Sequence, residues 1–353
     1  MKAITVLPGH AGSARLDDVD EPPLSDGPVL VQTWLVGICG TDTSMLAGEH
    51  GCAPPGSDRL IIGHESLGHV IQAPTSSGLA VDDLVVGIVR RPDPEPCPNC
   101  AAGEWDMCRN GRYTERGLKQ RHGFASERFR LHPMYAIRVP PDLGHLGVLV
   151  EPISVVAKVW EQIEYIGARS HWQPQRVLVS GAGPIGLLAA LLGVQRGLDV
   201  HVFDRVTSGP KPQLVADLGA TYRSESIAEA SRGVDVVIEC TGVGQLVLDV
   251  IQRETAPNTI MALTGFSSGE PAMTIDAATM NRHMVLGNEV VFGSINANRR
   301  HYEAGLLALA KADRGWLDRL ITRRVPLERW AAAFERQPGD IKTVIGFTVH
   351  APS

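Results

Sequence analysis

The sequence predicts an α/β protein with two domains, one of them mostly β and the other built on a doubly wound parallel sheet. The chain has 353 residues, which exceeds the usual size of a single domain. Up to about residue 155 it reads as short strands separated by turns, and from about residue 175 strands alternate with helices. We expect the first domain to comprise residues 1–157 and 297–353, and the second to comprise residues 158–296.

Composition restricts the kinds of partner. Apolar residues make up 44% and charged residues 20% of the chain, which is typical of a globular protein. The net charge of −6 provides no positive field for nucleic acid or an anionic membrane, so we expect small-molecule partners. The longest apolar run, 185–194, is about half of what spans a bilayer, and the N-terminus lacks the features of a signal peptide. We therefore expect a cytoplasmic protein.

The first domain is predicted from alternating apolar segments bounded by turn residues. Its strands are expected at Ala3–Leu7, Val29–Val36, Leu67–Ile71 and Leu84–Val89. A long polar, proline-rich loop is expected from Arg90 to about Arg121. The tail from about Asn298 is expected to return to a helix and a final strand, Val344–Val349.

The second domain begins with a βαβ unit: a strand at Arg176–Ser180, an apolar helix through Gln195 and a strand at Asp199–Phe203. Apolar runs predict three more buried strands, at Val234–Ile238, Thr259–Leu263 and Val290–Phe292. Segments 216–231 and 243–254 are expected to be the intervening helices.

A glycine-rich turn joins the first strand of this unit to its helix. Residues 181–186 read Gly-Ala-Gly-Pro-Ile-Gly, so Gly181, Gly183, Pro184, Ile185 and Gly186 fit the dinucleotide-binding pattern of a Rossmann domain. The helix N-terminus would face the pyrophosphate with its free amides. The alternative is that the glycines serve only a tight turn.

The next strand ends at an acid. Asp204 lies eighteen residues after Gly186, where a carboxylate can accept hydrogen bonds from the ribose hydroxyls of NAD and would repel the 2′-phosphate of NADP. Arg205 follows directly, and its guanidinium could bind that phosphate. We expect NAD to be preferred, with NADP also accepted.

Two loop motifs supply side chains that zinc prefers. Cys39 lies in GICGTD (37–42) and His64 in GHE (63–65), each in a loop after a predicted strand. Taken singly, a cysteine or a histidine is more often a packed side chain than a metal ligand. Glu151 lies in an apolar stretch, where an unpaired carboxylate costs roughly several kcal/mol, so we expect it to have a cation partner. Three protein ligands and an open fourth position are typical of a catalytic zinc.

A second cluster consists of Cys97, Cys100 and Cys108. Its CxxC spacing resembles one half of a structural zinc site, for which Asp93 is the nearest fourth ligand. The alternative is a loop that keeps its thiols without zinc.

These motifs together resemble the zinc-dependent medium-chain dehydrogenases, and specifically the archaeal-type glucose 1-dehydrogenases, from end to end. The motif GICGTD carries Cys39 and Thr41, GHE carries His64 and Glu65, and LVEPIS (149–154) carries Glu151, each as in that family. Segments that match the sugar branch more specifically are Arg90-Arg91, 113–117, 122–124, 265–267 and 293–296. The resemblance implies a GroES-like catalytic domain, a Rossmann domain, a role in carbohydrate metabolism, and assembly as a homodimer or homotetramer.

The resemblance also implies roles for residues outside these motifs. Glu115, Asn296 and Glu151 would face the substrate. The residues expected to line the nicotinamide are Thr241, Leu263, Thr264, Phe266, Ser294 and Asn296.

The sequence departs from the pattern of this branch in two places. The usual first cysteine of the second zinc lobe is absent, and Val89, Val155 and Leu286 stand where the branch can carry polar side chains. An apolar wall would suit a substrate with fewer or substituted hydroxyls.

The expected chemistry is oxidation of an alcohol to a ketone or a lactone. Zinc would lower the pKa of the substrate hydroxyl, and hydride would pass to the nicotinamide. Thr41 would relay the proton, and His50 would end the relay unless it is a bystander. Glu65 would act behind the ligands or as an exchangeable ligand.

Two other functions fit part of the sequence. A zinc-free reductase of enones or quinones would share the fold but would not need Cys39, His64 and Glu151. A dinucleotide-sensing protein without turnover would keep the glycine turn but would not need Thr41 or the zinc ligands.

Overall fold

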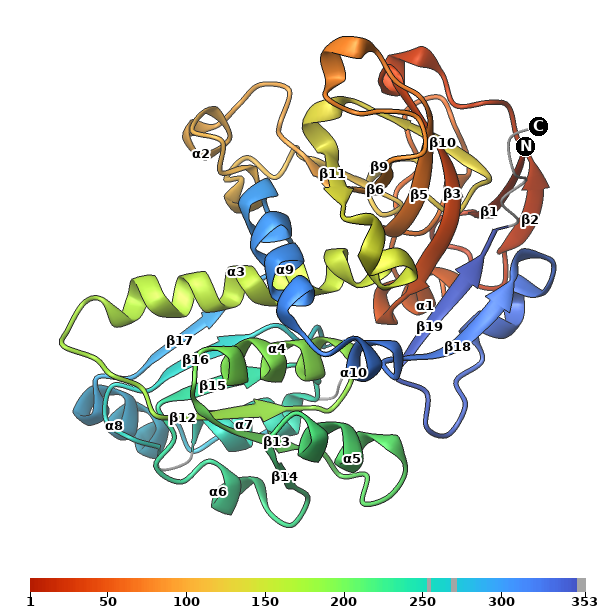
Figure 1. Cartoon of the computed structure of the whole chain (residues 1–353). Coiled ribbons are helices and arrows are strands. Elements are labelled where there is room, and N and C mark those ends of the chain that lie inside the picture. The colour runs from red at the N-terminus through yellow and green to blue at the C-terminus, as the bar shows by residue number, and fades with distance from the viewer. Residues whose placement is uncertain (253–254, 268–271, 348–353) are drawn as a thin grey trace. The chain divides into compact units, whose positions relative to one another are not determined.

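A computed structural model describes residues 1–252, 255–267 and 272–347 of the chain (Figure 1). The chain forms two compact units. The first comprises Met1–Ser154, Asn296–Ala310 and the segment from Ile321 onward; the second comprises Val155–Ile295 and Lys311–Leu320. Residues 311–320, which the sequence analysis assigned to the first domain, thus pack with the second unit.

The first unit is mostly β. Its strands are β1 (Lys2–Val6), β2 (Arg15–Asp18), β3 (Val29–Ile38), β4 (Leu60–Ile61), β5 (Glu65–Gln72), β6 (Leu84–Gly87), β7 (Arg90–Arg91), β8 (Thr114–Arg116), β9 (Gln120–Arg121), β10 (Arg128–Leu131), β11 (Ala136–Val139), β18 (Ile321–Pro326) and β19 (Lys342–Gly346). Its helices are α1 (Gly40–Leu46), α2 (Pro98–Ala101) and most of α9 (Arg299–Lys311). The four strands predicted in this region correspond to β1, β3, β5 and β6. The predicted final strand corresponds to β19, and its last two positions lie outside the described residues.

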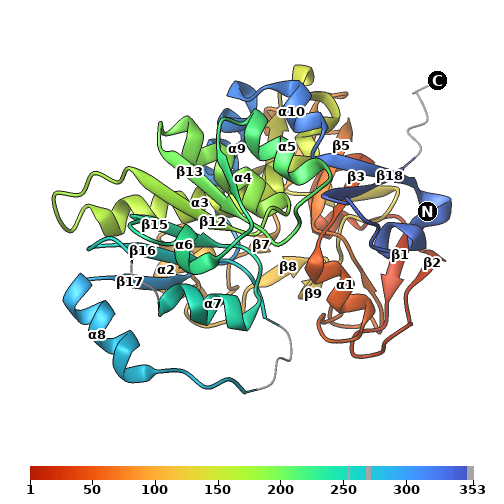
Figure 2. The same cartoon turned by 90° about the horizontal axis from the view of Figure 1, so that it is seen from below.

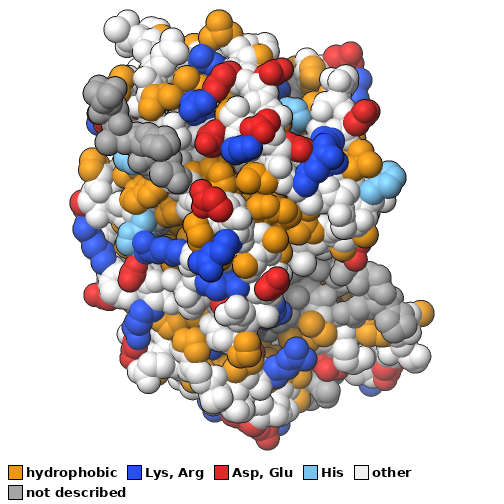
Figure 3. All heavy atoms as spheres, turned by 90° about the vertical axis from the view of Figure 1, so that its right-hand side faces the viewer, with side chains coloured by type: hydrophobic (Ala, Val, Ile, Leu, Met, Phe, Trp, Pro, Cys, Tyr) orange, Lys and Arg blue, Asp and Glu red, His pale blue; other side chains and the backbone are white. Residues whose placement is uncertain are grey.

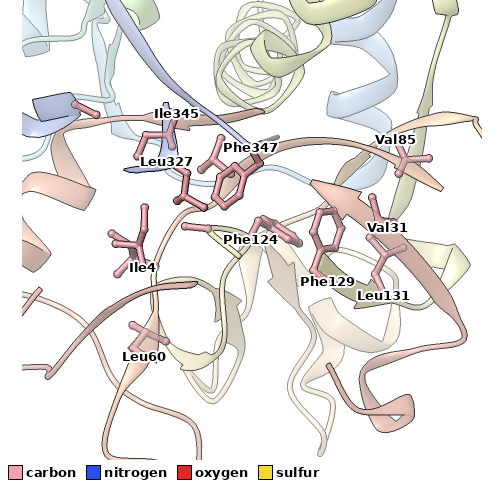
Figure 4. Close-up of a cluster of buried hydrophobic side chains, with 14 of the residues drawn as sticks. Ile4, Val31, Leu60, Val85, Phe124, Phe129, Leu131, Leu327, Ile345 and Phe347 are labelled. Carbon is pink, nitrogen blue, oxygen red and sulfur yellow. The ribbon is translucent and has the colours of Figure 1, made fainter. Parts of the chain in front are cut away.

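The main sheet of this unit runs in the order β11-β6-β5-β3-β19-β18, with β10 also paired to β3. Alternate residues of β3 are buried, as the period of a half-buried strand requires. The core beneath the sheet gathers Val31, Val85 and Ile345 around two phenylalanines (Figure 4). The rings of Phe124 and Phe129 meet edge to face with centroids 4.7 Å apart, a favourable geometry for aromatic pairs.

The expected loop from Arg90 to about Arg121 is wrong in part, because it contains α2 and a small sheet in the order β7-β8-β9. These strands have two or three residues each, which is too short to give a periodic pattern in the sequence. The antiparallel register sets Arg90 directly opposite Glu115.

The second unit is a doubly wound domain around a parallel sheet in the order β14-β13-β12-β15-β16-β17. Its strands are β12 (Arg176–Ser180), β13 (Asp199–Phe203), β14 (Thr221–Arg223), β15 (Val236–Glu239), β16 (Ile260–Leu263) and β17 (Val290–Gly293). Its helices are α4 (Pro184–Gln195), α5 (Pro210–Asp217), α6 (Ile227–Ala230), α7 (Gly244–Ile251), α8 (Ala277–Gly287), α10 (Arg314–Asp318) and most of α3 (Val150–Gly167). The predicted fold class is confirmed.

Helices cover both faces of this sheet (Figures 1 and 2). On one face α6 and α7 pack on Leu178, Val237 and Met261 of the strands. On the other face α3 packs on α4, where the indole nitrogen of Trp160 donates a hydrogen bond to the carbonyl of Ala189 at 3.3 Å. The sheet is therefore buried from both sides, which explains its continuous apolar strands.

The helix predicted over 216–231 is wrong. That segment holds the end of α5, the strand β14 and the short helix α6. Gly219 has a φ of +83°, a left-handed conformation that ends helices, and β14 follows at once. The helix predicted over 243–254 corresponds to α7, and its last two positions lie outside the described residues.

One helical stretch in the described part of the chain, Pro141–Gly167, is long and apolar enough to cross a membrane. However, 83% of its most apolar window is buried inside the protein. Such burial is typical of a core helix.

Candidate metal and dinucleotide sites

Three side chains of the kinds that bind zinc meet in the first unit. Cys39, His64 and Glu65 bring their ligand atoms within 4.8 Å of one another. Cys39 follows β3 and caps α1, while His64 and Glu65 lie at the start of β5. The Cys39 Sγ lies 3.1 Å from the His64 Nε2. A thiol, an imidazole and a carboxylate are a donor set that fits zinc.

Asp42 orients the histidine. One of its carboxylate oxygens accepts the backbone N–H of Cys39 at 3.0 Å, and the other lies 3.3 Å from the His64 Nδ1. Burial opposes charge on this pair, but their mutual attraction lowers the pKa of Asp42 and raises the pKa of His64. With Nδ1 directed at Asp42, the Nε2 of His64 is left to face the cluster, as in carboxylate–histidine–metal arrangements.

Lys342 of β19 pairs with Glu65. Its Nζ lies 2.6 Å from the Glu65 Oε1 and 3.1 Å from the carbonyl oxygen of Ile38. Burial alone would lower the pKa of Lys342, but the Glu65 carboxylate and Cys39 outweigh it and raise that pKa. Gly37 lies directly opposite Glu65 in the sheet, and a Cβ there would be 2.0 Å from the Glu65 Oε2. The first glycine of GICGTD thus makes room for this carboxylate.

Three other residues were expected near the metal: Glu151, Thr41 and His50. Glu151 is buried in the first turn of α3 and lies outside the group of three. Burial raises its pKa to about 7, although His64 and Lys342 act in the opposite direction. Thr41 is exposed in the first turn of α1, and His50 lies half-buried in the loop after it.

Two of the predicted substrate-binding residues are in direct contact. The amide Nδ2 of Asn296 donates a hydrogen bond to the Glu115 Oε1 at 2.8 Å. Val89 is buried in the same unit, whereas Val155 and Leu286 belong to the second unit, where Leu286 is exposed on α8.

The second cysteine cluster also forms. The thiols of Cys97, Cys100 and Cys108 lie within 4.8 Å of one another, and Asp93 is not part of this group. The carboxylate of Asp93 accepts the backbone N–H of Glu95 and lies 3.4 Å from the Nε of Arg112. Backbone N–H groups lower the pKa of Cys97 to about 6, and burial raises the pKa of Cys100 to about 11. Three ligands are in place, and a closed zinc site needs four.

The glycine turn of the second unit has the geometry that a dinucleotide requires. Gly181 has a φ of +97°, and a Cβ on Gly186 would lie 1.8 Å from the carbonyl oxygen of Gly181. A Cβ on Gly183 would meet no atom within 4 Å, so this position leaves room for a ligand. No side chain caps the N-terminus of α4, where Pro184 and Ile185 begin the helix, so its amides can bind a pyrophosphate.

Asp204 has more partners than the sequence suggests. Its Oδ2 accepts hydrogen bonds from the Lys211 Nζ and the Ala182 N–H, both at 2.8 Å. Burial favours the neutral acid, but these bonds prevail and lower the pKa of Asp204. Arg205 is exposed beside it. Lys211 therefore neutralises the acid that was expected to select the cofactor.

Glu239, at the end of β15, organises the loops expected near the nicotinamide. Its Oε1 accepts the N–H of Thr241 at 2.7 Å, and its carbonyl oxygen accepts the N–H of Thr264 at 2.9 Å. Ser294 donates its N–H to the carbonyl oxygen of Leu263 at 2.9 Å. The loops after β15, β16 and β17 thus end at one edge of the sheet, where α/β proteins bind ligands. Phe266 in this region is 67% exposed.

Four supporting residues were missed by the sequence analysis: Asp42, Lys342, Lys211 and Glu239. Asp42 lies three residues after Cys39, the spacing of a helix capping box, and this signal could have found it. Lys342 is 277 residues from Glu65, so no local pattern connects them.

Comparison with known proteins matches both parts of the chain. Residues 144–347 match the family "Glucose dehydrogenase C-terminus", and residues 25–141 match "Alcohol dehydrogenase GroES-like domain". The glucose 1-dehydrogenases of Methanocella arvoryzae and Thermoproteus tenax are each 39% identical to the chain, over 98% of its length and 99% of theirs. The structure of Haloferax mediterranei glucose dehydrogenase in complex with NADP, Zn and gluconolactone matches with a TM-score of 0.90 at 33% identity, covering 99% of this chain and 100% of that one.

Replacement of Cys39 by alanine should remove the metal and leave dinucleotide binding intact, because the two sites lie in different units. We expect zinc content, measured by mass spectrometry after dialysis, to fall by about one ion per chain relative to the unchanged protein. Affinity for the reduced dinucleotide, measured by fluorescence titration, should change by less than about twofold.

The matched variant is Asp42→Asn, which keeps an oxygen for the Cys39 N–H but weakens the hold on His64. It should bind zinc about ten- to a hundredfold more weakly in a chelator competition. A zinc content in Cys39→Ala equal to that of the unchanged protein would refute this site. Two zinc ions per chain in the unchanged protein would show that Asp93 or water closes the second cluster.

Proposed function

We infer the function of this chain from its family: it belongs to the glucose 1-dehydrogenase branch of the zinc-dependent medium-chain dehydrogenases. It is a zinc- and NAD(P)-dependent dehydrogenase that oxidises a hydroxyl group of a sugar, polyol or sugar-derived substrate. The observation that carries the assignment to this chain's own residues is the group of Cys39, His64 and Glu65, in which His64 and Glu65 are buried and Cys39 is half-buried.

Neither a zinc-free reductase nor a dinucleotide sensor explains why Cys39, His64 and Glu65 lie together. Such a reductase or sensor has no chemical use for a buried imidazole and a buried carboxylate beside a half-buried thiol, with Asp42 and Lys342 paired to them. Burying ionisable groups costs several kcal/mol each, roughly, unless pairing or a metal compensates. The arrangement therefore favours a metal-dependent enzyme.

Zinc bound at this group supplies a Lewis acid that polarises the substrate hydroxyl, and the bound nicotinamide supplies the acceptor for hydride. Cys39 and His64 are the proposed ligands, with Asp42 fixing the ring of His64. Glu65 is the nearest further ligand, and its ion pair with Lys342 competes with the metal for its carboxylate. Glu151 lies outside the group of three, which favours a water-bridged role over direct ligation.

We propose Thr41 as the residue that receives the proton of the substrate hydroxyl. It is exposed and lies two residues after Cys39, in the first turn of α1. A neutral hydroxyl can relay a proton but cannot store it, so an acceptor must follow. His50, in the loop after the same helix, is the proposed end of the relay.

Substrate and cofactor recognition are assigned to other residues. Glu115 and Asn296, already in contact with each other, are the proposed ligands of the substrate hydroxyls. The glycine turn would hold the pyrophosphate, and Asp204 the adenosine ribose. We propose that NAD is preferred and NADP is also accepted, because Lys211 reduces the repulsion between Asp204 and a 2′-phosphate.

We propose that the enzyme works in the cytoplasm, with small molecules as its only substrates. All six cysteines lie in described residues and none is in a disulfide, which is usual in a reducing compartment. Figure 3 shows acidic and basic side chains interspersed on one face, without an extended area of one sign.

The proposed activity is tested with a panel of aldoses, polyols and sugar acids, using NAD and NADP in separate assays. Zinc-loaded protein should reduce the dinucleotide with at least one sugar of the panel, and removal of zinc with a chelator should abolish the reaction. Reduction of enones by metal-free protein, with no polyol oxidised, would favour the zinc-free reductase. Dinucleotide binding without any turnover would favour the sensor.

Asp204 and Lys211 should shift cofactor preference in opposite directions. Asp204→Asn keeps an oxygen for the Ala182 N–H but removes the charge, so it should shift kcat/KM towards NADP. Lys211→Ala leaves the carboxylate unscreened and should shift kcat/KM towards NAD. Repulsion of about 1–4 kcal/mol corresponds to a preference of roughly fivefold to nearly a thousandfold. An unmoved ratio in both variants, or a wild-type preference for NADP, would contradict the proposal.

We propose a homodimer or homotetramer, because β17 forms an open edge of its sheet and α8 exposes apolar side chains. Val285 and Leu286 on α8 are 65% and 76% exposed. Light scattering should give two or four times the chain mass of 37.9 kDa. Val285→Glu should lower that mass, whereas a single species of 37.9 kDa in the wild type would refute assembly.

A further inference from the structure

We propose that Arg90 is a positioning residue for the substrate. It donates hydrogen bonds to one carboxylate oxygen of Glu115, Oε1, and leaves the other, Oε2, to accept hydrogen bonds from the substrate hydroxyls. The inference rests on the proposed function and deepens it, because it names the side chain that sets the acceptor. Arg90 itself need not touch the substrate.

The first step is the contact between Arg90 and Glu115. The antiparallel pairing of β7 with β8 sets the two residues directly opposite each other. The Arg90 Nε and Nη2 lie 3.0 and 2.9 Å from the same oxygen, Oε1 of Glu115. The Arg90 side chain is 4% exposed and that of Glu115 12%, so solvent weakens this ion pair little.

The guanidinium is itself held in place from two further directions. Its Nη1 donates a hydrogen bond to the carbonyl oxygen of Asp106 at 2.9 Å. Its Cζ lies 3.7 Å from the centroid of the Tyr113 ring, within the range of a cation–π contact. Asp106 is tied in turn to Asn298, whose Nδ2 lies 3.1 Å from the Asp106 Oδ1. Arg90 therefore presents a fixed fork, which a lysine could not reproduce.

Asn296 completes the hold on the same oxygen. Its Nδ2 donates to the Glu115 Oε1 at 2.8 Å, while its own Oδ1 accepts the N–H of Ala297 at 2.8 Å. The second bond settles which end of the amide faces Glu115. Asn296 has a φ of +63°, a left-handed conformation that asparagine tolerates better than most residues.

Three donors thus converge on Oε1, which exceeds the two lone-pair sites of a carboxylate oxygen. Among the described residues, no donor is recorded on the Glu115 Oε2. That oxygen can accept two hydrogen bonds, which matches two neighbouring hydroxyls of a sugar. We therefore infer that the site selects substrates with a vicinal diol, and that Arg90 sets the direction in which Oε2 points.

The experiment is a double-mutant cycle of Arg90→Lys and Glu115→Gln, measured with D-glucose and 2-deoxy-D-glucose, or with the best sugar of the panel and its analogue lacking the neighbouring hydroxyl. Each single variant should raise KM about ten- to a hundredfold, with kcat changed much less. The double variant should be no worse than Glu115→Gln alone, because Arg90 acts only through Glu115.

A second readout separates positioning from general stability. The wild type should prefer the hydroxylated sugar over its deoxy analogue by about tenfold or more, and Arg90→Lys should lose most of this preference. Arg121→Lys makes the same change in β9, on the other side of β8, where the arginine pairs with Asp26, and should keep the preference. Zinc content should be unchanged in all of these variants. Arg90→Lys and Glu115→Gln should each lower the melting temperature, because each disturbs a largely buried ion pair, so the kinetics are measured well below that temperature.

Additive losses in the double variant, or a preference retained in Arg90→Lys, would overturn the inference. If Arg90→Lys does not fold, Arg90→Gln, which keeps one donor for Oε1, takes its place in the cycle. Failure of the wild type to oxidise any sugar would refute the proposed function instead, so the two failures are distinguishable.

Discussion

The metal group depends on the register of three neighbouring strands. β3 pairs with β5 so that Gly37 lies opposite Glu65, and β3 pairs with β19 so that Val344 lies opposite Gly37. This places Lys342 beside the carboxylate, although the two residues come from distant parts of the chain. A slip of one residue in either pairing would turn the acid or the lysine to the other face of the sheet. The pairing of the strands therefore determines where the Glu65 carboxylate and the Lys342 ammonium group lie, independently of any bound ligand.

The buried charges of this region orient side chains but add little to the stability of the fold. Asp42 and His64 form one pair, and Glu65 and Lys342 form another. The attraction within a buried pair roughly offsets the cost of removing both charges from water, so the net contribution to stability is small. Removal of one partner is costly because it leaves a buried charge alone. The pairs thus hold Cys39 and His64 in a single arrangement.

The sequence predicted the family, the fold class and the reaction type, and the comparisons confirm them. These predictions rested on local patterns: a glycine turn between strand and helix, and Cys39 and His64 in short motifs. The small sheet of β7, β8 and β9 was not predictable, because strands of two or three residues have no period. Lys342 was not predictable for another reason, since only the folded sheet brings it to Glu65.

A paired carboxylate and cation is present at each of the three proposed sites: the metal site, the substrate site and the cofactor site. Each has a carboxylate to which we assign a role in recognition or chemistry, and each carboxylate has a cation partner: Lys342 for Glu65, Arg90 for Glu115 and Lys211 for Asp204. The partners differ in kind. A lysine acts as a point charge that can leave one oxygen for another, whereas the planar fork of an arginine fixes direction. Lysine therefore suits the acids beside a metal or a cofactor phosphate, where charge must be redistributed on binding. Arginine suits Glu115, because in the proposed role the direction of a single oxygen would determine which hydroxyls are recognised.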